Sequence, residues 1–172
     1  NIIKRKLSVM VKLNKKRINL LEKFQILIDE YNAGAINAEI FFKKLISFAK
    51  KLNKEEKRGI SENLSEEELA MFDLLYKPGL TEKEKEKVKS VAKKLLEKLK
   101  QEKLVLDWRK RQQTRADVLL TIQTILDEEL PESYTRVMFG EKCNLVFQHI
   151  YDSYFGQNMS IYQQYKKKVE VY

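Results

Sequence analysis

Large apolar residues recur at helical spacing in the first third of the chain. Three stripes repeat at intervals of three or four residues, which places each stripe on one face of a helix. They are Ile3, Leu7, Met10 and Val11, then Leu20, Phe24, Leu27 and Tyr31, then Phe41, Leu45, Phe48 and Leu52. The pattern predicts three amphipathic helices, with Gly34 ending the second and Asn37 capping the third.

Two capping boxes mark the next helix starts. In each, a hydroxyl residue stands three positions before a glutamate, so that the two side chains can satisfy amides at the beginning of a helix. Ser65 with Glu68 predicts a short helix that ends before Pro78. Thr81 with Glu84 predicts a longer helix whose apolar stripe is Val88, Ala92, Leu95 and Leu99.

The remaining pattern predicts two long helices. The first runs from about Leu104 to Glu129, and Pro131 ends it. The second starts near Thr135 and carries a broad apolar face made of Phe139, Cys143, Val146, Phe147, Ile150, Tyr151 and Tyr154. Such a face requires a partner surface, so we interpret it as core or interface, with Phe147, Tyr151 and Tyr154 as its aromatic candidates. The pattern fades in residues 156–172, which stay an unassigned tail.

Composition narrows the fold class. The 172 residues include five Gly and two Pro, and 34% are charged, a balance typical of helical proteins. The length suits one domain, so we expect an all-α, irregular bundle of about seven amphipathic helices around a single core over residues 1–155. Because the chain opens with Asn1 directly in an apolar stripe, we interpret it as a fragment of a longer chain.

The single cysteine and the short apolar runs indicate the cellular compartment of the chain. Cys143 has no second thiol for an intramolecular disulfide, which indicates a reducing compartment. The longest apolar run is four residues, Leu69 to Phe72, whereas a membrane span needs about 20. We therefore expect a cytoplasmic chain that does not enter a membrane.

The net charge of +9 is concentrated near the N-terminus. Residues 1–60 carry +9, residues 61–130 carry −1, and residues 131–172 carry +1. This asymmetry is consistent with binding to a polyanion, with binding to an acidic protein face, or with a merely solvated helix exterior. The sign of the charge alone does not distinguish these alternatives. Lys15, Lys16 and Arg17 form one basic cluster within this region.

A second basic cluster follows Trp108, the only tryptophan of the chain. It consists of Arg109, Lys110, Arg111 and Arg115. On a helix, Asp107, Arg111 and Arg115 would form one row, and arginine presents a planar fork of donors that suits phosphate. These residues are candidates for contact with DNA or a protein partner, anchored by Trp108. The pattern fits an intrahelical ion-pair row with Trp108 in the core equally well.

No catalytic or metal-binding pattern stands out. The sequence lacks the glycine-rich phosphate loops and the HExxH and GxSxG motifs, and it has one histidine. We interpret His149 as a structural side chain beside the last apolar stripe. Glu66 to Glu68 suit a first helical turn, and Asp127 to Glu129 suit a solvated helix end. No catalytic, cofactor-binding or metal-binding residue is assigned.

Four stretches resemble one known family. They are residues 24–34 (FQILIDEYNAG), 64–75 (LSEEELAMFDLL), 106–113 (LDWRKRQQ) and 146–154 (VFQHIYDSY). Together, in this order, they look like the C-terminal helical region of the motor and restriction (R) subunit of type I restriction-modification enzymes. The resemblance covers about residues 2–155.

The resemblance implies a binding role. In that family, the R subunit carries a nuclease domain and two RecA-like motor domains, so ATP and Mg²⁺ are expected for the parent subunit and not for this fragment. The fragment would dock onto the methyltransferase and specificity subunits in a bacterial cytoplasm and contact double-stranded DNA, without catalysis by itself. The alternative is a free-standing helical adaptor that binds a protein and never meets nucleic acid.

Overall fold

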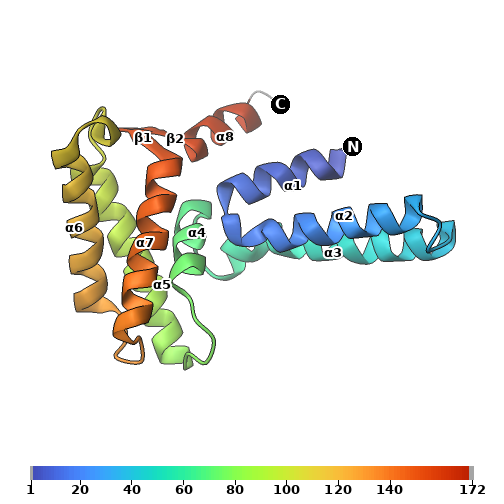
Figure 1. Ribbon diagram of the computed structural model, residues 1–172, viewed down its shortest axis with the longest axis horizontal. Coiled ribbons are helices and arrows are strands. Elements are labelled where there is room, and N and C mark those ends of the chain that lie inside the picture. The colour runs from blue at the N-terminus through green and yellow to red at the C-terminus, as the bar shows by residue number, and fades with distance from the viewer. Residues whose placement is uncertain (1, 171–172) are drawn as a thin grey trace. The chain divides into compact units, whose positions relative to one another are not determined.

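The computed structural model describes residues 2–170 and is almost entirely helical (Figure 1). Its helices confirm the all-α class. They are α1 (Ile2–Leu13), α2 (Ile18–Asn32), α3 (Ala38–Ser61), α4 (Glu66–Leu75), α5 (Glu82–Lys98), α6 (Gln112–Glu129), α7 (Arg136–Ser153) and α8 (Ile161–Glu170). Within the described residues, no helix is both long and apolar enough to cross a membrane.

The chain groups into two compact units and not around the single core that its length suggests. Unit 1 ends at Ser65 and unit 2 begins at Glu66. Apolar periodicity shows that each helix buries one face, but it does not show which faces share a core. In unit 1, each apolar stripe packs on the helix next to it in sequence, so three helices suffice to cover one another.

Unit 1 consists of α1, α2 and α3, with α2 and α3 running antiparallel (Figure 1). Its core is formed by Leu7, Met10, Phe24, Phe48 and Leu52, all from the three predicted stripes. The turn before α3 is also as predicted. Gly34 has a φ of +73°, and the Asn37 side chain accepts a hydrogen bond from the Ile40 amide at 2.9 Å.

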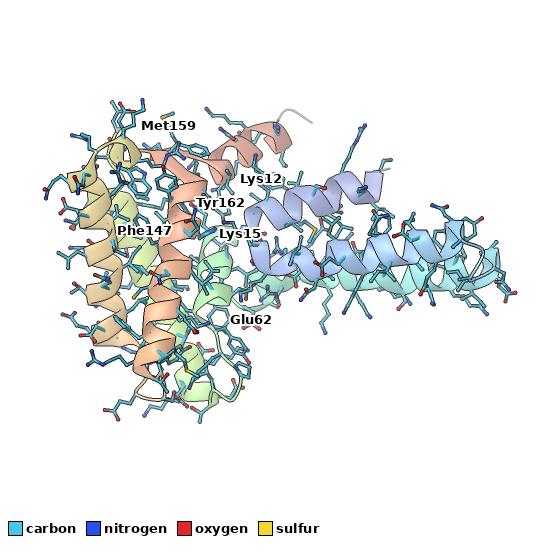
Figure 2. The ribbon with its side chains drawn as sticks, viewed as in Figure 1. Lys12, Lys15, Glu62, Phe147, Met159 and Tyr162 are labelled. Atoms are coloured by element: carbon cyan, nitrogen blue, oxygen red, sulfur yellow. The ribbon has the colours of Figure 1, made fainter. Side chains whose placement is uncertain are left out.

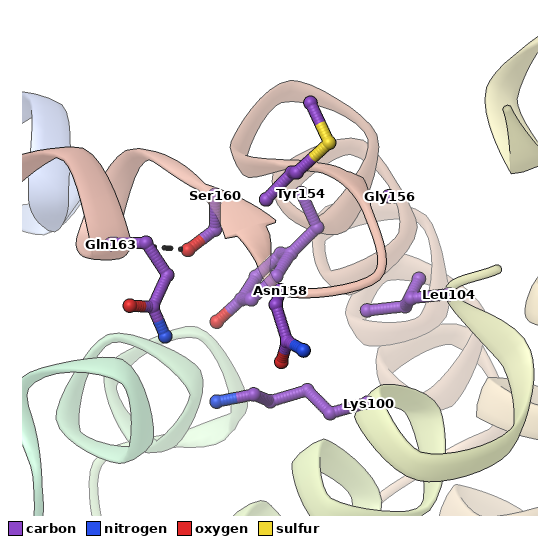
Figure 3. A pocket seen from close by; sticks show the side chains of 8 residues that line it. Lys100, Leu104, Tyr154, Gly156, Asn158, Ser160 and Gln163 are labelled. Atoms are coloured by element: carbon purple, nitrogen blue, oxygen red, sulfur yellow. Dashed lines mark hydrogen bonds between the residues drawn. The ribbon is translucent and has the colours of Figure 1, made fainter. Parts of the chain in front are cut away.

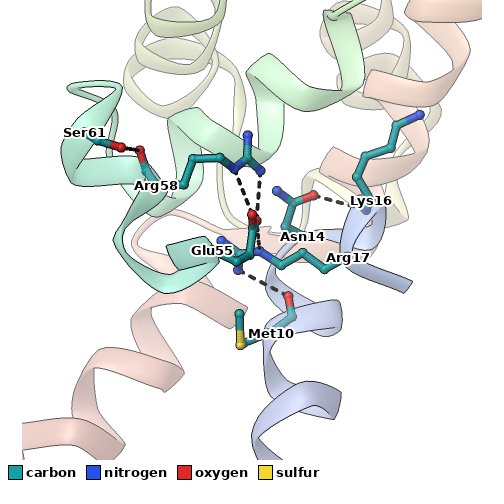
Figure 4. A network of polar contacts seen from close by, with 7 residues as sticks. All are labelled: Met10, Asn14, Lys16, Arg17, Glu55, Arg58 and Ser61. Atoms are coloured by element: carbon teal, nitrogen blue, oxygen red, sulfur yellow. Dashed lines mark hydrogen bonds and ion pairs between the residues drawn. The ribbon is translucent and has the colours of Figure 1, made fainter. Parts of the chain in front are cut away.

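A partly buried ion-pair network ties the start of α2 to α3 (Figure 4). Arg17 is only 3% exposed, and its Nε lies 2.9 Å from Glu55 Oε1. Arg58 donates to both oxygens of the same carboxylate, at 2.9 and 3.0 Å. Burial by itself would raise the pKa of Glu55, but hydrogen bonds from Arg58 and Arg17 lower it below its ordinary value.

Unit 2 is built on α4 to α7. Helix α4 packs against α5 and α7, and α6 packs against the same two helices (Figure 1). The predicted capping box of Thr81 and Glu84 is present. Helix α7 starts beside Thr135 as predicted, and the Thr135 side chain caps it. The predicted stripe of α5 is buried, as Val88, Ala92, Leu95 and Leu99 are all inaccessible to solvent.

Residues 99–111 depart from the predicted helix. A π-helical turn at Leu99–Lys103 ends α5, a short 3₁₀ turn spans Trp108–Lys110, and α6 begins only at Gln112. We refer to residues 99–111 as the elbow. Asp107 takes a left-handed conformation with φ of 57°. The expectation of a helix from Leu104 was therefore wrong, because the buried stripe of α6 starts only at Val118.

The tail without a sequence assignment is folded as far as Glu170. After α7, strand β1 (Tyr154–Gly156) pairs antiparallel with β2 (Met159–Ser160), and α8 follows. Asn158 turns the hairpin with a φ of 55°. Two short strands leave the all-α class intact, although the sequence pattern did not predict them.

Candidate functional site

Trp108 is a core residue of unit 2. Its side chain has no exposed surface, and its Nε1 donates to the carbonyl oxygen of Tyr154 at 3.0 Å. The indole also makes edge contacts with Phe147, labelled in Figure 2, and Tyr151, with ring centroids 6.4 and 6.0 Å away. Trp108 therefore anchors the elbow to the end of α7. In this position it is not available to anchor a partner.

The arginines around Trp108 face the main chain of unit 2. Arg109 Nη1 donates to the Tyr151 carbonyl at 3.1 Å, and its guanidinium lies over the rings of Tyr151 and Phe155. Arg111 Nη2 donates to the Leu106 carbonyl at 3.1 Å. Arg115 Nη1 donates to the Arg109 carbonyl at 2.6 Å. The helical row of Asp107, Arg111 and Arg115 does not form, because the first two residues precede α6.

These contacts explain why an irregular segment is stable here. A helix satisfies its own carbonyls, whereas the elbow needs other donors for them. Side chains supply these donors. The Thr114 hydroxyl, for example, lies 2.5 Å from the Trp108 carbonyl oxygen and 3.0 Å from that of Arg111, so its one proton is placed between these two acceptors. The basic cluster thus works as a set of internal donors. Lys110 differs, because its side chain is 78% exposed and its partner, Asp107 at 3.3 Å, is exposed as well.

The cluster of Lys15, Lys16 and Arg17 also contains both a buried side chain and exposed ones. Arg17 is buried in the network with Glu55, while Lys15 and Lys16 are exposed. Asn14 shapes this turn by accepting a hydrogen bond from the Lys16 amide at 3.1 Å. Two of the three predicted contact residues therefore face solvent.

The aromatic face of α7 is mostly internal. Phe147 and Tyr151 are partly buried against Trp108, and Tyr154 is 2% exposed. The Tyr154 hydroxyl donates to Glu67 Oε1 at 3.0 Å, and Lys100 Nζ contacts both oxygens of that carboxylate at 3.1 and 3.0 Å. Burial, followed by the Glu67 charge, raises the pKa of Tyr154 well above its ordinary value. The sequence left open whether the apolar face of this helix is core or interface, and Tyr154 belongs to the core.

A small polar cavity lies beside this network. It measures about 20 Å³, room for about one water molecule, and Lys100, Tyr154, Asn158 and Ser160 are among its lining residues (Figure 3). Nearby, His149 is 2% exposed and lies 3.3 Å from Ser153 Oγ and 3.4 Å from the Tyr162 hydroxyl. Within residues 2–170, no three His, Cys, Asp or Glu side chains are placed to hold a metal ion.

Several exposed apolar side chains of unit 1 lie near the turn that joins α2 to α3. We call this region the hairpin tip. It includes Tyr31, a member of the predicted stripe of α2 whose ring stacks on Phe41. Its other exposed apolar side chains, which the sequence pattern did not single out, are Ile40, Phe42 and Ile46. Phe42 is 60% exposed and Ile46 is 43% exposed, one turn apart on α3. The charged residues among them are paired, Lys43 with Glu39 at 3.1 Å and Lys44 with Glu30 at 3.2 Å. The sequence did hold a signal for this surface, because Phe42 and Ile46 are large apolar residues that fall outside the buried stripe of α3.

Comparison with known proteins identifies the family. Residues 1–154 match the family model described as type I restriction enzyme HindI endonuclease subunit-like, C-terminal. The chain belongs to this family. It is also 26% identical over 117 residues to the putative type I restriction enzyme MjaIXP endonuclease subunit of Methanocaldococcus jannaschii. That alignment covers 67% of this chain and 11% of the relative, so the chain spans a small part of the curated protein. No solved structure matches the chain.

The family match ends at the residue that holds the elbow against the end of α7. Tyr154, the last matched position, supplies the carbonyl that accepts the Trp108 hydrogen bond. The restriction-subunit family region therefore contains both partners of this contact, while β2 and α8 lie beyond it.

Proposed function

We propose that this chain is the C-terminal helical module of a type I restriction endonuclease subunit, and that it docks the subunit onto the methyltransferase and specificity subunits. The family match over residues 1–154 is the observation that carries this proposal. ATP-dependent translocation and DNA cleavage, with their ATP and Mg²⁺, belong in this proposal to the rest of the subunit. The complex would act in the cytoplasm.

The hairpin tip is the docking surface that the geometry favours. Interface cores are enriched in aromatic and apolar side chains and depleted of unpaired charge, and the tip combines Phe42 and Ile46 with two local ion pairs. The elbow is a weaker choice, because Trp108, Arg109, Arg111 and Arg115 already make internal contacts. An aromatic residue at the centre of an interface commonly carries much of the binding energy, so we assign the anchor role to Phe42.

Assembly with the purified methyltransferase and specificity subunits tests the docking proposal. The variant Phe42→Gln with Ile46→Gln removes two exposed apolar side chains and should leave unit 1 folded. A matched control, Leu120→Gln with Val137→Gln, changes side chains that are 61% and 72% exposed in unit 2. We expect the tip variant to weaken association about tenfold or more, which corresponds to about 1.4 kcal/mol. Equal binding by the tip variant and the control would refute this docking surface.

Contact with double-stranded DNA is a second function that we propose, and the charge of unit 1 favours it. Residues 1–65 contain 15 Lys and Arg against 7 Asp and Glu, a net charge of +8, whereas residues 66–172 carry +1. A positive surface of this kind attracts a polyanion. A free-standing adaptor would bind its protein partner without any affinity for duplex DNA, so a duplex-binding assay separates the two roles.

A further inference from the structure

Three exposed lysines form a row on α3. Lys50, Lys54 and Lys57 are spaced at i, i+4 and i+7, which places them on one face of the helix over about 10 Å. All three side chains are exposed, on the side of α3 away from the buried Phe48 and Leu52. We call these three residues the lysine row.

The lysine row is not neutralised by nearby carboxylates. Within residues 2–170, none of its three side chains has a hydrogen bond or an ion pair. Sequence positions 43–54 contain no Asp or Glu at all. Glu55 is held by Arg17 and Arg58, and Glu56 is paired with Lys6 at 2.9 Å.

Helix α5 shows how this chain builds an ordinary lysine-rich surface. Its first turns alternate Glu and Lys, and Lys89 pairs with Glu86 at 3.1 Å. Lys87 and Lys94 both contact Glu129 of α6. Like charges three or four residues apart destabilise a helix, and α5 offsets this repulsion with carboxylates. Helix α3 keeps the repulsion along its lysine row, which distinguishes it from a solvated exterior.

We propose that the lysine row binds the phosphate backbone of double-stranded DNA. This inference rests on the DNA contact proposed above and assigns it to α3 of unit 1. Lysine is depleted in protein–protein interfaces but serves readily as a point charge against phosphate, so a row of lysines favours DNA over an acidic protein. Duplex DNA carries one negative charge per about 1.7 Å of helix axis, which gives a row about 10 Å long several phosphates within reach. Such contacts carry little sequence preference.

Duplex binding across a salt series tests this assignment. The variant K50Q/K54Q/K57Q keeps helix propensity while removing three charges, because Lys and Gln have similar propensities. The matched control K166Q/K167Q/K168Q removes three charges from exposed lysines of α8. Fluorescence anisotropy with a labelled random-sequence duplex gives the affinity, and circular dichroism checks that all variants are folded.

We expect the α3 variant to lose at least about tenfold in affinity at low salt, with the log–log salt slope shallower by about 0.9 for each lysine that contacts a phosphate. The α8 control should keep the wild-type slope, and K50R/K54R/K57R should keep the affinity. If the α3 variant binds like wild type, or the α8 control loses as much, the lysine row is not the contact although the chain binds DNA. If wild type does not bind the duplex at low salt, the proposed DNA contact itself fails, and the docking assay remains independent of it.

Discussion

Trp108 Nε1 and the carbonyl oxygen of Tyr154 form a hydrogen bond of 3.0 Å between residues 46 positions apart. Both residues are buried, so neither polar group has ready access to water. The bond joins the 3₁₀ turn of the elbow to the first residue after α7. Contacts between distant segments of this kind fix the path of an irregular segment that lacks helical hydrogen bonds.

Trp108→Phe should destabilise unit 2. The ring would still fill part of the space, but the Tyr154 carbonyl would lose its donor, and an unsatisfied buried polar group costs about 1–3 kcal/mol. Urea unfolding followed by circular dichroism measures the loss in the free energy of unfolding. Trp108→Ala should cost more, about 3–5 kcal/mol, because it also leaves a cavity. A Trp108→Phe variant as stable as wild type would contradict this role.

Arg111→Gln and Arg115→Gln should lower stability without weakening DNA binding as the lysine-row variant does. Each arginine donates to an elbow carbonyl, and a hydrogen bond from a charged donor contributes about 1.5–3 kcal/mol, less where solvent competes. Thermal unfolding measures the first effect and the anisotropy assay measures the second. A loss of DNA affinity as large as that of the lysine-row variant, in folded protein, would restore these arginines as the contact residues.

The sequence predicted the regular elements because each has a local signal. The stripe through Phe24 and Leu27, the Asn37 cap and the Thr81 capping box all appear where the spacing placed them. The elbow has no such signal, since its stability depends on donors such as Arg115 and on an acceptor at Tyr154, far away in sequence. Helical spacing treated Asp107, Arg111 and Arg115 as one exposed row, although the chain between Asp107 and Arg111 is not α-helical.

The same limit applies to the candidate sites. Trp108 and Tyr154 were candidates for a partner surface on residue type and helical spacing, which left core and interface open, and only the fold shows that they are buried. The lysine row could have been found from its spacing and from the absence of carboxylates at positions 43–54. The ion pairs that neutralise α5 come partly from Glu129 on another helix, which no local pattern reveals.

The stability of the fold should decrease as the pH is lowered through the acid range, because of Glu129. Hydrogen bonds from Lys87 and Lys94, together with their charges, lower the pKa of Glu129 to about 2. A carboxyl whose pKa is lower in the folded state stabilises the fold above its unfolded pKa, near 4.5, and this contribution disappears as pH falls toward 2. The melting temperatures of wild type and Glu129→Gln should therefore differ at pH 6 and converge near pH 2. Glu128→Gln serves as the control, and a constant gap across this range would contradict the assignment.

Cys143 should be unreactive in the folded protein. It is 2% exposed, and burial, followed by the charge of Asp127, raises the pKa of its thiol to about 11. The thiolate is the reactive form, so labelling by Ellman's reagent at pH 8 should be slow in buffer and fast in denaturant. Cys143→Ser provides the blank. Rapid labelling of the folded chain would show that α7 opens readily or that the thiol is accessible.

The unneutralised charge on α3 also bears on how the protein tolerates salt. Repulsion among Lys50, Lys54 and Lys57 is screened as ionic strength rises, so added salt should protect the α3 amides against hydrogen exchange. The ion pairs that Glu129 makes with Lys87 and Lys94 weaken under the same conditions, so α5 should gain less protection or lose some. One solution variable thus affects the two helices differently. A buffer chosen to stabilise one unit for crystallisation or NMR will not suit the other equally.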